Sequence, residues 1–160
     1  MPRYLGRDEG ATLLEFGLIL PLTLMLLLGI AEGARFVSEQ QAISTASREA
    51  ARFGSTTGVN DAGVPNYADC AAIRARARNS TPFELVDTDI LVTYDEGPAT
   101  SQIGLCATTG PFSDPDAIES GNRIVVRVSK RFESALPFIG SVFDLDISAT
   151  EHRTIVKGDL

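Results

Sequence analysis

The sequence predicts an α+β protein in which one long N-terminal helix packs on a small antiparallel sheet of about three strands. Three observations support this prediction. An uncharged apolar run extends from Phe16 to Ala31, a helical pattern continues to Phe53, and alternation of apolar and polar residues appears only in the second half of the 160-residue chain. A helix followed by strands, without regular alternation of the two, is typical of the α+β class.

The apolar segment from Ala11 to Ala31 predicts a membrane-spanning helix. It has 21 residues, and at 1.5 Å per residue such a helix covers about 30 Å, the hydrocarbon thickness of one bilayer. A short leader, residues 1–10, precedes it. The alternative is a secretory signal peptide cleaved near Ala34, but the helical pattern continues beyond that point.

Glu15 places a carboxylate inside this apolar segment. A charge in lipid costs roughly 2.5–3.5 kcal/mol at the bilayer centre and less near an edge, so an ionisable residue there is a functional candidate. Alternatively, Glu15 reaches the membrane interface near the start of the helix, where negative charge suits the helix dipole. Helix packing is suggested by Pro21, which removes one helical hydrogen bond, and by Gly29 and Gly33, whose small-xxx-small spacing permits close approach of a second helix.

An amphipathic continuation of the helix is expected over residues 32–54. Its apolar side chains recur on one face of a helix, at Phe36, Ile43, Ala46, Ala50 and Phe53. No proline interrupts the chain from Thr23 to Gly54, and Gly54 is a suitable C-terminal stop. The apolar stripe is expected to pack either on the chain's own soluble domain or on a neighbouring subunit.

Residues 55–160 are expected to form one extracytoplasmic α+β domain. After a linker over residues 55–66, a short helix is predicted from Tyr67 to Asn79, with Cys70, Ile73 and Ala77 on its apolar face and Arg74, Arg76 and Arg78 elsewhere. Alternating patterns predict strands over residues 86–95, 123–129 and 145–150, the last with a possible extension to Val156. An irregular loop is expected over residues 97–121. The apolar connection Leu136–Gly140 is expected to cap the core, with an exposed contact site as the alternative.

Two cysteines, Cys70 and Cys106, are expected to form a disulfide, with two buried free thiols as the alternative. An even number of cysteines suits an oxidising compartment. The arginines flanking the apolar segment are balanced, so charge does not fix the orientation. The short leader and the large polar region after the helix favour a cytoplasmic N-terminus.

Composition argues against nucleic-acid binding and catalysis. The formal net charge is −7 and only two lysines occur, so there is no basic patch for phosphates. His152 is the single histidine, which leaves no convincing catalytic constellation, zinc site or cofactor site. Asp114, Asp116 and Glu119 lack the spacing of a known calcium loop and are expected to form a solvated acidic turn. We therefore expect no catalytic residue, no metal and no cofactor.

Gly10 followed by Ala11, with Glu15 and Phe16 fifth and sixth after the glycine, resembles the processing region of prepilin-like proteins. Residues 9–54 are similar to TadE-like pseudopilins of tight-adherence pili, and the matching positions include Leu20-Pro21, Gly29-Ile30, Glu32, Arg35-Phe36 and Ala46 to Arg52. The resemblance implies a pilin-like fold, cleavage between Gly10 and Ala11 by a prepilin peptidase, and pairing of the new Ala11 amine with Glu15 of another subunit.

The resemblance also implies the function of a minor pilin or pseudopilin, a structural subunit for assembly, priming or the tip of a tight-adherence pilus or related secretion apparatus. The implied partners are the prepilin peptidase, other pilins, inner-membrane assembly platform proteins and membrane lipid. The implied location is the inner membrane, with a single span, and the extracellular pilus after assembly. The alternative function is a signal-anchored extracytoplasmic binding module that does not enter a filament; an anchored hydrolase is a third, disfavoured hypothesis.

Overall fold

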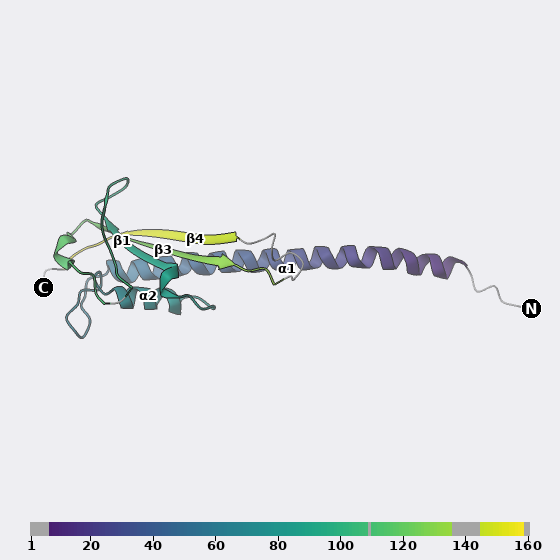
Figure 1. Cartoon of the computed structure of the whole chain (residues 1–160), viewed down its shortest axis with the longest axis horizontal. Coiled ribbons are helices and arrows are strands. Elements are labelled where there is room, and N and C mark those ends of the chain that lie inside the picture. Colours follow the sequence, from purple (N-terminus) through teal and green to yellow (C-terminus); the bar gives the residue numbers. More distant parts are fainter. Residues whose placement is uncertain (1–6, 109, 136–144, 159–160) are drawn as a thin grey trace, which may run out of the picture.

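The computed structural model describes residues 7–108, 110–135 and 145–158. Helix α1 (Arg7–Ser55) is 49 residues long, which corresponds to a length of about 70 Å. Figure 1 shows its N-terminal half as a rod that projects from a small domain, with the C-terminal end of the chain at the far end of that domain. The predicted continuity of the helix through the apolar and amphipathic segments is therefore present in the structure.

The domain contains an antiparallel sheet of four strands, one more than the approximate number predicted. The strands are β1 (Ile90–Asp95), β2 (Gln102–Leu105), β3 (Arg123–Phe132) and β4 (Leu145–Thr154), in the spatial order β2-β1-β3-β4. The β3–β4 ladder is the longest and pairs Arg123 with Thr154 at one end and Phe132 with Leu145 at the other. A second helix, α2 (Cys70–Asn79), precedes the sheet.

One face of the sheet packs against the second half of α1 and against α2. Apolar residues alternate along β1 and β3, and their inward members meet the alanines of α1 in a single core. The small alanine side chains let the helix lie close to the sheet. The buried core includes Ile43, Ala46, Ala50, Ile73, Ala77, Val92, Tyr94, Ile124, Val126 and Val128. This arrangement is the predicted α+β architecture.

Three local features differ from the sequence prediction. The first predicted strand begins only at Ile90, because residues 87–89 form a 3₁₀ turn. The Asp89 carboxylate accepts a hydrogen bond from the Val86 amide (3.0 Å), and this local bond replaces strand pairing. The expected irregular loop over residues 97–121 contains β2 and a 3₁₀ turn at Pro115–Ala117. The predicted helix from Tyr67 begins later, at Cys70, where Asp69 is its N-cap and accepts from the Ala72 amide (2.9 Å).

The apolar connection Leu136–Gly140 lies outside the described residues, so its predicted role in capping the core stays a prediction.

Candidate assembly surface on the N-terminal helix

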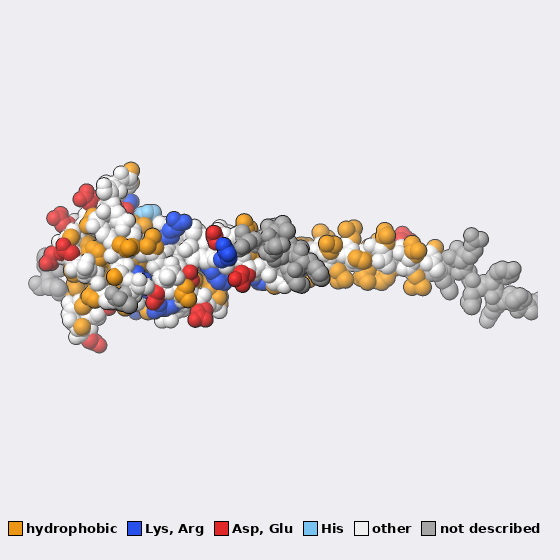
Figure 2. All heavy atoms as spheres, viewed as in Figure 1, with side chains coloured by type: hydrophobic (Ala, Val, Ile, Leu, Met, Phe, Trp, Pro, Cys, Tyr) orange, Lys and Arg blue, Asp and Glu red, His pale blue; other side chains and the backbone are white. Residues whose placement is uncertain are grey.

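The first half of α1 is apolar on every side and packs against nothing in the described chain. Its large apolar side chains between Leu13 and Ile30 are 42–76% exposed. Figure 2 shows hydrophobic side chains along the visible face of the rod beyond the domain. By length and composition, the described residues contain one helix that could cross a membrane, and this is its apolar half. Such a surface needs either lipid or other helices around it, because contact with water is unfavourable for so large an apolar area.

Glu15 is an exposed carboxylate in this apolar surface. It has no hydrogen-bond or ion-pair partner among the residues that the structure describes. Ala11, four residues earlier, lies on the same side of the helix. A carboxylate surrounded by lipid is unfavourable unless a cation neutralises it or it reaches the interface. Within the described part of the chain, no cation pairs with Glu15. A cation that neutralises it would therefore have to come from another molecule.

Four glycines lie within the apolar half of α1 and at the start of its amphipathic continuation. At Gly10, Gly17, Gly29 and Gly33 an added Cβ would meet no atom of the chain within 4 Å. Glycine inside a helix costs roughly 0.5–1 kcal/mol relative to alanine. Packing within this chain does not account for that cost. Gly33 also lies 18 residues after Glu15, which is about five helical turns, so the two share one side of the rod.

Pro21 lies within α1, and the helix continues through it. The proline ring removes one backbone donor and leaves the carbonyl four residues earlier without its usual partner. Two residues later, the Thr23 hydroxyl donates to the Ile19 carbonyl (3.0 Å), a side-chain bond to the preceding turn of the helix. In a membrane, a neighbouring helix can supply a partner for the carbonyl that Pro21 leaves unpaired.

Ionic contacts join the rod to the domain directly after the apolar run ends. Glu32 accepts a hydrogen bond from the Ala135 amide (2.9 Å). Arg35 pairs with Glu39 (3.3 Å), and Glu39 also pairs with Lys130 of β3 (3.2 Å). Figure 2 shows acidic and basic side chains gathered where the rod meets the domain. Because the Glu39–Lys130 pair bridges α1 and β3, it helps to hold the sheet against the helix at the end nearest the predicted membrane.

An aromatic contact reinforces the same junction. The ring of Phe36 on α1 meets the ring of Phe132 on β3 edge to face, with centroids 5.3 Å apart and planes at 88°. The Arg35 guanidinium lies 4.9 Å from the centre of the Phe132 ring. Aromatic pairs of this geometry add about 0.5–1.5 kcal/mol beyond their burial. The end of β3 is therefore fixed to the helix by both rings and charges.

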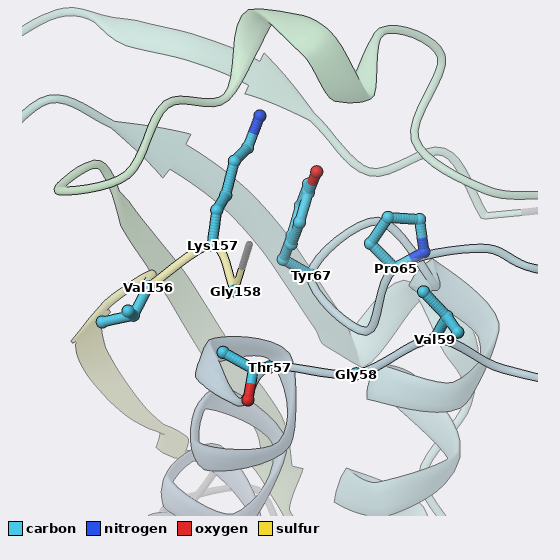
Figure 3. A pocket seen from close by; sticks show the side chains of 8 residues that line it. All are labelled: Thr57, Gly58, Val59, Pro65, Tyr67, Val156, Lys157 and Gly158. Atoms are coloured by element: carbon cyan, nitrogen blue, oxygen red, sulfur yellow. The ribbon is translucent and has the colours of Figure 1, made fainter. Parts of the chain in front are cut away.

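The opposite end of the domain contains a shallow pocket between the end of α1, the following loop and the C-terminal segment. Figure 3 shows the Lys157 side chain running beside the Tyr67 ring, with its ammonium 5.4 Å from the ring centre. The pocket holds about 140 Å³, which is below the range of roughly 300–1,000 Å³ typical of ligand sites. We assign it no ligand. Its lining residues are Thr57, Gly58, Val59, Pro65, Tyr67, Val156, Lys157 and Gly158.

Cys70 and Cys106 form a disulfide that ties the start of α2 to the residue after β2. Arg74, one turn further along α2, is 3% exposed, although the sequence prediction placed it off the apolar face. Its guanidinium donates to backbone carbonyls that come from β1 and from the chain after β2. The helical pattern contains no signal for this burial, because the acceptors are distant in sequence.

The residues that the sequence offered for catalysis or metal binding lie on the surface of the domain. His152 lies exposed on β4, and Asp114, Asp116 and Glu119 are exposed near the 3₁₀ turn at Pro115–Ala117. Among the described residues, no group of three His, Cys, Asp or Glu side chains is placed to hold a metal ion.

The rod and its junction can be compared with known families. A family model described as TadE-like protein matches residues 10–52. Residues 10–52 are a TadE-like segment. The match begins at Gly10 and ends three residues before α1 does, so it covers the apolar rod, Glu15 and the amphipathic continuation. A search of curated proteins and a search of solved structures both found no match.

The TadE-like match relates the chain to Tad pilus proteins, a structural and non-enzymatic family. The rest of the chain, from the end of α1 through the sheet, lies outside the match. The match thus covers both the exposed apolar rod and the part of α1 that is buried against the sheet, including Ile43 and Ala46.

Proposed function

We propose that this chain is a TadE-like minor pilin or pseudopilin, a structural subunit that assembles, primes or caps a tight-adherence pilus or a related secretion apparatus. One observation supports this proposal most strongly. Glu15 stands exposed and without a described partner in an apolar helix, one turn after Ala11, inside the TadE-like segment. A subunit that stayed alone in lipid would gain nothing from this carboxylate.

The first step of the proposed pathway is hydrolysis of the peptide bond between Gly10 and Ala11 by a prepilin peptidase. Water is consumed, Gly10 keeps a new carboxylate, and Ala11 gains a free α-amino group. Gly10 is exposed and lies in the first turn of α1, where few backbone hydrogen bonds must open. The absent side chain lets a protease approach the backbone closely.

The second step is pairing of the Ala11 ammonium of one subunit with the Glu15 carboxylate of another. Either charge alone is unfavourable in lipid, and pairing relieves both. The glycines at 29 and 33, which have open space around them, would let a second helix lie close to the rod. Other pilins, platform proteins of the inner membrane and lipid are the partners of this step.

The location that fits this function is a single span in the inner membrane, with the N-terminus cytoplasmic and the sheet domain outside. The domain that follows α1 is large for a subunit of a thin major filament, which favours a minor, priming or tip position. The segment boundaries that accompany the proposal are a leader over residues 1–10, a span over 11–31, a helical continuation over 32–54 and a domain over 55–160.

The test is the N-terminus of the mature protein after co-expression with a prepilin peptidase. Wild type is expected to begin at Ala11, and Gly10→Ala is expected to retain Met1. Gly17→Ala is the matched control, because both glycines are helical and have open space at the Cβ position. Retention of Met1 in wild type, or cleavage near Ala34, would contradict the proposal and favour an anchored binding module or a secreted protein.

A further inference from the structure

Arg74 is a buried cation that is partnered only by carbonyl oxygens in the described part of the chain. Its side chain leaves α2 and donates to the Ile90 carbonyl at the start of β1 (3.4 Å) and to the Cys106 carbonyl (2.8 Å). A third bond goes to the Ala107 carbonyl. No carboxylate of the described residues pairs with it. Burial accordingly lowers the pKa of Arg74 from its ordinary value.

Burying a charge without a counter-ion is costly unless its hydrogen bonds are well placed. Here two of the three acceptors belong to consecutive residues, Cys106 and Ala107, in a stretch that contains little regular structure. Their positions must be fixed for the guanidinium to stay buried. The same stretch contributes Phe112 and Ile118 to the core.

The disulfide fixes those acceptors from the same face of the same helix. Cys70 and Arg74 are four residues apart on α2, so they lie side by side one turn apart. Cys70 forms the disulfide with the Cys106 side chain, and Arg74 donates a hydrogen bond to the Cys106 carbonyl. The Tyr94 hydroxyl lies 3.1 Å from the Cys106 sulfur and donates to the Tyr67 carbonyl. Three side chains from two elements therefore converge on one residue.

We propose that the disulfide and the buried Arg74 form a single redox-dependent lock on the loop segment, defined here as residues 102–108 and 110–118. In the oxidised chain, the bond from Cys70 holds the two carbonyls that allow Arg74 to be buried. In the reduced chain, the positions of these carbonyls are no longer fixed by the disulfide. The Arg74 guanidinium then becomes exposed to solvent, and the loop segment opens.

Formation of the Cys70–Cys106 disulfide requires an oxidant that itself contains a disulfide, such as a small-molecule disulfide or an oxidoreductase. One cysteine thiolate attacks the oxidant and forms a mixed disulfide, and the second thiolate then displaces the other half. Cys70 and Cys106 together lose two protons and two electrons, and the oxidant is reduced to two thiols. The domain thus acquires its disulfide and its closed loop segment only in a compartment that supplies such an oxidant. This inference does not depend on the proposed pilin function.

Both sulfurs are shielded, since Cys70 and Cys106 are 0% and 2% exposed. A reductant can therefore reach them only when the loop segment opens, and the rate of reduction reports that opening. Without Arg74, two hydrogen bonds to the segment are removed and opening becomes more frequent. Global unfolding also exposes the disulfide, so a control must weaken the fold elsewhere.

The experiment measures the rate of disulfide reduction by dithiothreitol in the full chain in detergent micelles, followed by thiol alkylation and mass spectrometry. Arg74→Met keeps a long side chain but removes all donors, and it is expected to be reduced at least tenfold faster than wild type. Ile147→Ala is the control, because Ile147 is buried on β4 beside β3 and away from the loop segment. It is expected to change the rate less than threefold under conditions that keep the chain folded.

A second measurement keeps the test decisive if Arg74→Met folds poorly. Hydrogen exchange of the loop segment is compared for Arg74→Lys and wild type, each with the disulfide intact and each with both cysteines changed to serine. We expect the substitution to raise exchange at least tenfold with the disulfide present and less than twofold without it. A wild-type reduction rate in Arg74→Met, equal acceleration by Ile147→Ala, or equal exchange effects in both backgrounds would overturn the proposal.

Discussion

Gly104→Ala should destabilise the domain, because the ring of Phe112 occupies the space where a Cβ would stand. That Cβ would lie 2.4 Å from the ring Cζ and 2.6 Å from Cε2. Phe112 is 5% exposed and packs on Tyr94 with ring centroids 4.8 Å apart. The ring cannot move aside without leaving the core.

The expected cost is about 1–3 kcal/mol for overpacking, and displacement of the Phe112 ring would also weaken its packing on Tyr94. For a domain of about 100 residues, this corresponds to a fall in Tm of roughly 5–15 °C. Thermal unfolding in detergent, followed by near-ultraviolet circular dichroism of the tyrosine and phenylalanine signals, measures it. Leu105→Ala is the control, since Leu105 is the next residue on β2 and is 51% exposed; it should change Tm by a few degrees at most.

The result also tests the register of β2. The structure pairs Tyr94 with Gly104 and Thr93 with Leu105. A slip of one residue would move Gly104 to the outer face, where an added methyl group would be harmless. A Gly104→Ala variant as stable as wild type would therefore refute the placement of β2, and a large effect of Leu105→Ala would point to the slipped register.

Three further variants test other contacts. Asp95 accepts two hydrogen bonds from Arg123 (2.7 and 2.9 Å), and this contact lowers the pKa of Asp95. The contact stabilises the fold above the unfolded-state pKa near 3.9, and this stabilisation is lost as pH falls through the lower pKa of the folded state. Asp95→Asn should therefore be less stable than wild type at pH 7 and equally stable in strong acid. Phe36→Ala should lower the free energy of unfolding by denaturant by about 2–3 kcal/mol and leave the apolar rod unchanged. An unchanged midpoint of the unfolding curve would mean that the helix and the sheet are not joined at Phe36. Replacing Cys70 and Cys106 by serine opens a crosslink across 36 residues and should lower stability by about 3–4 kcal/mol, and a loss below about 1 kcal/mol would contradict a structural role for the bond.

Local patterns predicted the elements whose environment is set nearby in the sequence. The long helix follows from unbroken apolar and amphipathic periodicity, and β3 follows from the alternation of Ile124, Val126 and Val128. Their burial in the structure agrees with that alternation. The disulfide pairing followed from there being two cysteines in the chain.

The elements that were missed depend on distant partners. Strand β2 has four residues with a glycine among them, and it forms because it can pair with β1. Its own residues give almost no strand signal. Arg74 stands at a position where a helical wheel places a solvent-facing charge, and three carbonyls from β1 and from the chain after β2 bury it instead. The exposed apolar rod was predictable because its length and composition are local properties of the sequence, whereas its role in assembly stays a prediction.

The most direct test of the proposed assembly is the amount of protein recovered in the sheared extracellular fraction of cells that carry a tight-adherence assembly machinery. Glu15→Gln keeps the shape of the side chain and removes its charge, and Glu49→Gln is the control because Glu49 lies on the same helix beyond the apolar run and already pairs with Arg52. We expect Glu15→Gln to be inserted and cleaved before Ala11 but reduced at least tenfold in the extracellular fraction, while Glu49→Gln matches wild type. Recovery of Glu15→Gln at the wild-type level would contradict the pairing of Glu15 with a neighbour's new amine.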